Sequence, residues 1–163
     1  MDAGLLIVRL VVGLTMAAHG AQKLFGWFGG YGLTGTGHFM EQLGFRPGRA
    51  QALVAGLGEL GAGLLLAIGF LTPAAAAVLV AVMLVAVLGV HLKAGFFAQG
   101  GGYEYALVLG AVALALAFTG PGAFSVDRAL GMDWSGAPWG LTALVAGLVG
   151  GTVPLVARRP ARA

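Results

Sequence analysis

The chain has 163 residues, of which 59% are hydrophobic and only 9% are charged, and its mean hydropathy is +0.94. A water-soluble domain typically carries about 25% charged residues, so most of this surface must face a lipid bilayer rather than water. The sequence has no cysteine, which excludes disulfides, iron–sulfur clusters and thiol chemistry, and the net charge of +3 without a basic stripe or nucleic-acid motif indicates membrane topology and no nucleic-acid partner.

Five apolar segments approach the roughly 20 residues that a helix needs to cross the hydrocarbon core. They cover about residues 5–25, 50–71, 74–93, 103–118 and 138–157. Glycine-rich loops follow the first, third and fourth segments, and Thr72-Pro73 ends the second, where proline suits the first turn of a new helix. The start Met1-Asp2-Ala3 lacks the basic leader of a cleavable signal peptide. The sequence therefore predicts an all-α, polytopic transmembrane bundle.

The long connection after the first segment, residues 27–49, is not featureless. Thr36 is predicted to cap a short helix that runs through Gln42 and turns Phe39, Met40 and Leu43 towards lipid or the bundle. Trp27 and Tyr31 would lie in the aromatic belt at the membrane surface. An ordinary connector with aromatic anchors explains this segment equally well.

The distribution of basic residues favours five spans. With the N-terminus outside, seven basic residues fall on or near the cytoplasmic side and only Arg9 and Arg128 fall towards the outside. The seven are Lys23, Arg46, Arg49, Lys93, Arg158, Arg159 and Arg162. A four-span topology would place the basic tail outside, or would require the whole molecule to be inverted. We therefore expect the C-terminus to be cytoplasmic if there are five spans.

Ionisable residues within the apolar segments are the candidates for a site, because each costs roughly 2.5–3.5 kcal/mol on an insertion scale. They are Arg9, His19, Lys23, Glu59, His91 and Glu104. At 100° per residue, Arg9, His19 and Lys23 share a stripe about 80° wide on one helix. His19, Lys23, His91 and Glu104 also lie towards one membrane face, which the charge distribution predicts to be cytoplasmic.

Glu59 is the strongest single candidate, because a short carboxylate near the middle of a span cannot reach the headgroups. Its helical neighbours Ala55, Gly56, Ala62 and Gly63 are small, which admits a neighbouring backbone or a ligand. Possible hydrogen-bond donors to Glu59 are His19, Lys23 and His91. Two interpretations remain open: an interhelical ion pair that fixes packing, or a ligand or proton site, which we favour.

The other ionisable residues each have a simpler alternative. Arg9 either serves the site or extends to the outer headgroups, and Lys23 either serves the site or marks the cytoplasmic boundary. His91 and Glu104, on either side of a glycine-rich turn, are predicted to exchange a proton. His19 and His91 are too few ligands to indicate a metal site, so no metal, haem or iron–sulfur cluster is predicted. Pairs such as Gly147 with Gly151 indicate helix packing.

Four stretches together resemble the DoxX family of small prokaryotic membrane proteins. They are Arg9 with His19-Gly20-Ala21-Gln22-Lys23-Leu24-Phe25-Gly26, then Gly58-Glu59-Leu60-Gly61-Ala62-Gly63, Gly69-Phe70-Leu71-Thr72, and Gly120-Pro121-Gly122-Ala123-Phe124-Ser125-Val126-Asp127. The resemblance implies a four-helix bundle over residues 1–131. Residues 132–163 extend beyond that family core, and their apolar segment and arginines predict a fifth span and a basic cytoplasmic tail. The resemblance also implies the prokaryotic plasma (inner) membrane, and quinone-coupled oxidation of thiosulfate or complexes that handle sulfur compounds and oxidative stress.

Three functional hypotheses follow. The first is a membrane oxidoreductase subunit that binds a quinone, with Glu59, His91 and His19 as catalytic proton carriers. Arg9, Lys23 and Glu104 would then bind the quinone or a small anionic substrate. The second is a non-catalytic anchor that recruits a soluble or membrane protein partner through its loops and basic tail. The third is a small proton or solute transporter, which the lack of an internal repeat disfavours. Whether the protein is itself an enzyme stays open.

Overall fold

The computed structural model describes residues 1–159, and within this range every regular element is a helix. The elements are α1 (Asp2–Phe25), α2 (Gly32–Gln42), α3 (Gly48–Ile68), α4 (Thr72–Val85), α5 (Glu104–Thr119), α6 (Val126–Ala129) and α7 (Ala137–Ala157). A π-helical turn, Ala86–His91, continues α4, and short 3-10 turns occupy Trp27–Gly29, Leu92–Ala94 and Ala98–Gly100. Arg162, one of the seven basic residues assigned to the cytoplasmic side, lies outside the described residues.

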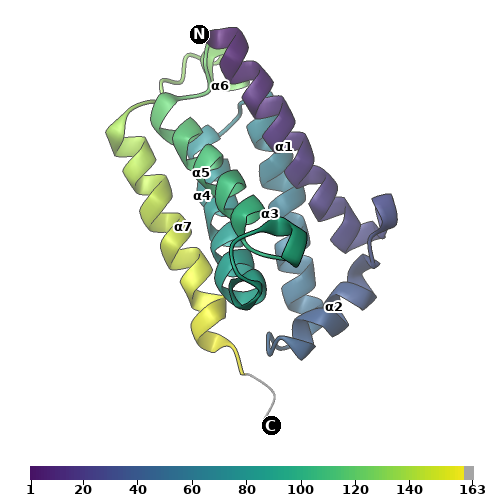
Figure 1. Ribbon diagram of the computed structural model, residues 1–163. Coiled ribbons are helices and arrows are strands. Elements are labelled where there is room, and N and C mark those ends of the chain that lie inside the picture. Colours follow the sequence, from purple (N-terminus) through teal and green to yellow (C-terminus); the bar gives the residue numbers. More distant parts are fainter. Residues whose placement is uncertain (160–163) are drawn as a thin grey trace.

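Figure 1 shows α1, α3, α4, α5 and α7 running side by side, with the start of α1 and the end of α7 at opposite ends of the bundle. Four helical stretches are long and apolar enough to cross a membrane: Asp2–Phe25, Gly48–Ile68, Thr72–Ala94 and Ala137–Ala157. α5 is apolar but has only 16 residues. At 1.5 Å per residue it spans roughly 24 Å, slightly less than a typical hydrocarbon core. The predicted helical membrane bundle is thereby confirmed.

Helices α1 and α3 pack in direct backbone contact through glycine. A Cβ atom on Gly63 would stand 2.6 Å from both the backbone nitrogen of Ala17 and the carbonyl oxygen of Gly13. Two turns further along α1, a Cβ atom on Gly20 would meet the backbone nitrogen of Leu60 and stand 2.6 Å from the carbonyl oxygen of Gly56. Small residues let two helix backbones approach closely, and this close packing is a common way for helices to associate in lipid. Gly56 and Gly63, two of the small neighbours of Glu59, therefore serve the α1–α3 contact.

Glycine also joins α7 to the rest of the bundle. Gly147 and Gly151 face α4, where added Cβ atoms would stand 2.6 Å from Val80 and 2.7 Å from the carbonyl oxygen of Ala81. The predicted packing role of this glycine pair is confirmed. The main core of the bundle lies between α1, α3, α4 and α5 and includes Met16, Leu66, Leu79, Ala113 and Leu116.

α2 lies across one end of the bundle, between α1 and α3 in the chain (Figure 1). The predicted cap at Thr36 is wrong: the helix begins at Gly32, and Thr36 is a buried residue of its second turn. A left-handed glycine at position 32, φ 63°, allows the turn that starts the helix earlier. Phe39 is exposed and Met40 is buried against Phe45 and Ala52.

Candidate functional site

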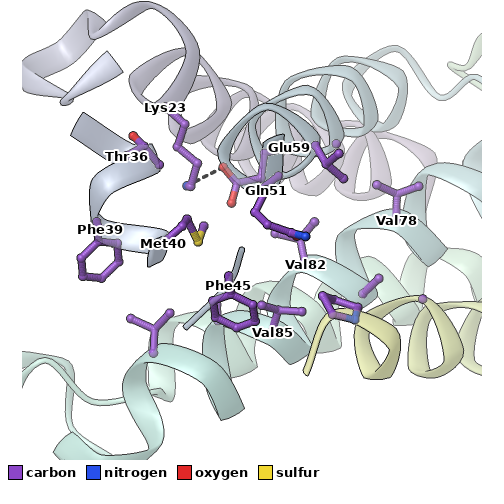
Figure 2. A pocket seen from close by; sticks show the side chains of 18 of the residues that line it. Lys23, Thr36, Phe39, Met40, Phe45, Gln51, Glu59, Val78, Val82 and Val85 are labelled. Carbon is purple, nitrogen blue, oxygen red and sulfur yellow. Dashed lines mark hydrogen bonds and ion pairs between the residues drawn. The ribbon is translucent and has the colours of Figure 1, made fainter. Parts of the chain in front are cut away.

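A cavity of about 460 Å³ lies between α2, α3, α4 and α7, at the end of the bundle that α2 covers. Its walls are almost entirely aliphatic or aromatic, and the polar side chains on them are Lys23, Thr36, Gln51, Glu59 and His91. Figure 2 shows Thr36, Phe39 and Met40 of α2 on one side of the cavity, and Val78 and Val82 of α4 across from them. A concave, mostly apolar space with a few convergent polar groups is the usual form of a small-molecule site.

An ion pair forms the polar wall of this cavity. Lys23 of α1 donates from Nζ to Oε2 of Glu59 on α3 over 2.6 Å, and the two side chains point towards each other in Figure 2. Glu59 is buried, whereas Lys23 remains about one quarter exposed. Of the three donors predicted for Glu59, Lys23 is the one that contacts it. The pair is an interhelical link between α1 and α3, as one of the two interpretations predicts, and both of its residues also line the cavity.

The cavity opens on the outer surface of the bundle, where lipid would lie. Val54 of α3 and Val78 of α4 line it and are 68% and 40% exposed. Phe39 of α2, also on the wall, is exposed as well. An apolar rim of this kind admits a molecule from the hydrocarbon core, because entry there exposes no polar group of the protein.

The π-helical turn Ala86–His91 forms the far wall, with Ala86, Val90 and His91 on the cavity. Nδ1 of His91 lies 2.7 Å from the carbonyl oxygen of Gly101, in the loop before α5, which fixes the orientation of the ring. π-helical turns occur often at functional sites, where they re-aim a side chain that a regular helix would direct elsewhere. His91 and Glu59 therefore line one space from two different helices.

Two of the predicted site residues, His19 and Glu104, are not among the residues that line this cavity. Nδ1 of His19 lies 3.1 Å from Oε1 of Gln22, and its ring packs edge-on against Tyr105 of α5. Glu104 accepts a hydrogen bond from the backbone nitrogen of Ala98 over 3.0 Å and so closes the loop before α5. The structure brings together Glu59, Lys23 and His91, and leaves His19 and Glu104 at the periphery.

Arg9 is separated from the others because it lies towards the opposite end of α1. It is fully buried, so its guanidinium does not extend to the headgroups; it donates to the carbonyl oxygens of Pro121, over 2.8 Å, and Phe124. These carbonyls belong to the loop between α5 and α6. Arg9 therefore holds this loop against the bundle, and it does not contact the cavity that Lys23 lines.

Asp127, which the sequence reasoning did not single out, completes this buried polar cluster. Its carboxylate accepts hydrogen bonds from the backbone of Leu71 over 2.8 Å and of Thr72 over 3.0 Å, and from the Thr72 hydroxyl over 2.7 Å. Asp127 thereby caps the start of α4, where an anion is favoured by the helix dipole. Its place at the end of the motif at residues 120–127 was the one available signal. Thr36 and Gln51 were likewise not assigned to the site.

The donor set on the cavity wall suits an oxygen-bearing, largely apolar ligand such as a quinone. Lys23 retains two further N–H donors beside the one that Glu59 accepts, and Gln51 and His91 add polar atoms on other walls. In residues 1–159, no three His, Asp or Glu side chains come close enough together to hold a metal ion.

These features define a multi-pass helical membrane protein with a laterally open cavity and an intramembrane ion pair. The DoxX family profile matches residues 4–92, from α1 through the π-helical turn. The chain is 33% identical over 136 residues to "Inner membrane protein YqjF" of Escherichia coli (strain K12), an alignment that covers 82% of this chain and 96% of the relative. The protein belongs to the DoxX family. No solved structure matches it.

Proposed function

We propose that this protein is the membrane subunit of a quinone-linked oxidoreductase system, with the quinone head group held in the cavity beside Lys23 and Glu59. The observation that carries this proposal is the ion pair on the wall of an apolar cavity that is open to lipid. An isoprenoid quinone has a polar head and an apolar tail, and so matches the two chemical parts of this space. The family resemblance makes thiosulfate or a related sulfur compound the proposed electron donor.

A bound quinone supplies the capacity to take up two electrons and two protons. Lys23 binds and orients a carbonyl oxygen of the head group through an N–H that Glu59 does not use. Glu59 holds the ammonium group of Lys23 in position and exchanges a proton at its carboxylate oxygens. His91, on the opposite wall and half-exposed, links the cavity to the surface for proton transfer. The aliphatic walls exclude water around these groups.

The test is solvent extraction and mass spectrometry of protein purified in mild detergent, comparing wild type, Glu59→Gln and Glu41→Gln. Glu41 supplies the same chemical change outside the cavity, because it is exposed on α2 and accepts from the backbone of Gly48. We expect near-stoichiometric quinone in wild type and Glu41→Gln, and at least about a tenfold loss in Glu59→Gln, the effect of removing one charge-assisted contact.

A second readout is thiosulfate-dependent reduction of an added soluble quinone by membranes that contain each variant. Activity unchanged by Glu59→Gln would remove Glu59 from the site. Wild-type protein that carries no quinone but retains a stoichiometric soluble polypeptide would overturn the redox proposal, and would make the chain a membrane anchor for that partner.

A further inference from the structure

The end of α7 is fastened to the turn that follows α2 by three contacts. Nε of Arg158 donates to the carbonyl oxygen of Leu43, and the guanidinium lies over the ring of Phe45 at 5.4 Å. The backbone nitrogen of Arg159 donates to the carbonyl oxygen of Gly44 over 2.9 Å. These contacts join residues more than 110 positions apart, and we call them the C-terminal clasp.

Phe45 is the residue that the clasp holds in place. It lines the cavity, is only 3% exposed, and packs with Met40, Ala52, Val85 and Leu155. On its other side it lies against the π-helical turn, where a Cβ atom on Gly89 would stand 2.9 Å from Cζ of its ring. The ring therefore fills the end of the cavity between α2, α4 and α7.

The two walls of the cavity are otherwise attached to different parts of the bundle. α2 packs against α3, where Gly37 lies against the backbone of Arg49 and Glu41 accepts from Gly48. α7 packs instead against α4 and α5. Within residues 1–159, the hydrogen bonds that cross directly from the turn after α2 to the end of α7 are those of the clasp.

We propose that the C-terminal clasp is a gate, which keeps the cavity closed to water at the end of the bundle covered by α2. Held by Arg158, the Phe45 ring leaves the lipid-facing opening as the route into the cavity. When Arg158 is released, the turn after α2 moves away from α7 and water reaches the Lys23–Glu59 pair. The inference rests on the proposed function, since it names how access to the same site is regulated.

The natural absence of cysteine allows a direct test with a single reporter thiol. Ala55 lines the cavity and packs beside the cluster that contains Phe45, so Ala55→Cys reports entry of a water-soluble, charged thiosulfonate reagent. Labelling rates are measured with Arg158→Ala and, as the matched control, with Arg159→Ala. Both variants lose one positive charge, but Arg159 contributes to the clasp through its backbone and keeps that bond.

We expect Arg158→Ala to raise the labelling rate of Ala55→Cys about tenfold, the size expected for losing one hydrogen bond and one cation–π contact. Arg159→Ala should leave the rate unchanged within twofold. Arg158→Lys keeps the charge but loses the bond to Leu43, so its rate should be intermediate. Thr34→Cys, on the exposed side of α2, corrects for reagent access and should react equally in every background.

Two results would contradict the gate. One is the same labelling rate of Ala55→Cys with Arg158→Ala as with Arg159→Ala. The other is an Arg158→Ala protein that labels as slowly as the protein with Arg158 intact. A helical circular dichroism spectrum and a single elution peak establish that each variant is folded. The labelling experiment needs no quinone, so it separates the two proposals. If Arg158→Ala raises the labelling rate but the wild-type protein retains no quinone, the gate stands and the proposed function fails. If Glu59→Gln loses quinone but Arg158→Ala does not raise the labelling rate, the proposed function stands and the gate fails.

Discussion

Two clusters of buried polar side chains lie towards opposite ends of α1. One is the Lys23–Glu59 pair on the cavity, and the other is Arg9 with the loop carbonyls and Asp127 near the start of α4. The sequence predicted the first cluster, because Glu59 in an apolar helix needs a partner and Lys23 was one of the three cations in reach. It wrongly grouped Arg9 with the cavity. Arg9 and Lys23 share a helix face, but their separation of 14 positions corresponds to roughly 21 Å along the axis.

The Asp127 cluster leads to a prediction about stability. Asp127→Asn retains the shape of the side chain but weakens its three hydrogen bonds and removes the charge near Arg9, so it should lower the free energy of unfolding by about 1–3 kcal/mol. Asp133→Asn is the matched control, because Asp133 is exposed and accepts from Ser135 alone. Thermal unfolding in detergent measures both. Equal melting temperatures for the two variants would contradict the structural role of Asp127.

At the scale of elements, the apolar segments predicted the five long helical stretches to within three residues at each end, when α4 is followed through its π-helical and 3-10 turns to Ala94. Lipid demands a continuous hydrophobic stretch, and glycine or proline ends it. The π-helical turn had no such signal. One extra residue per turn leaves the composition of the segment unchanged, and the contact of Gly89 with Phe45 that accompanies it depends on tertiary structure. The start of α2 was misplaced for a related reason: Thr36 suits a cap, but it is buried against the cavity.

The α1–α3 contact makes a paired prediction on one helix. Gly63→Ala places a methyl group where the backbone of α1 stands, so overpacking should destabilise the protein by about 1–3 kcal/mol. A Cβ atom on Gly61 would meet open space. Gly61→Ala should therefore leave the free energy of unfolding unchanged or raise it by up to about 1 kcal/mol, because alanine favours the helix. Unfolding in detergent at increasing denaturant compares the two. A neutral Gly63→Ala would show that α1 and α3 can separate without cost.

For the whole molecule, we propose five spans with the N-terminus outside. The described basic residues support this orientation: Arg46, Arg49, Lys93, Arg158 and Arg159 belong to the end of the bundle that carries α2, and Arg128 belongs to the other end. Ala98→Cys, in the exposed 3-10 turn before α5, and Ala129→Cys, at the exposed end of α6, test it in right-side-out vesicles. A membrane-impermeant maleimide should label Ala129→Cys directly and Ala98→Cys only after permeabilisation. The reverse labelling pattern would show that the N-terminus is cytoplasmic, the opposite of the proposed orientation.

The packing of α1 against α3 also makes the bundle mechanically asymmetric. Backbone-to-backbone contact at Gly13 and Gly63 joins these two helices, and the Lys23–Glu59 pair links them again at the cavity, so this side of the site is stiff. The facing side is the π-helical turn, whose backbone hydrogen bonds depart from the regular α-helical pattern. Under the proposed function, head groups of different width would therefore be accommodated by adjustment of the π-helical wall alone, while Lys23 and Glu59 keep their positions.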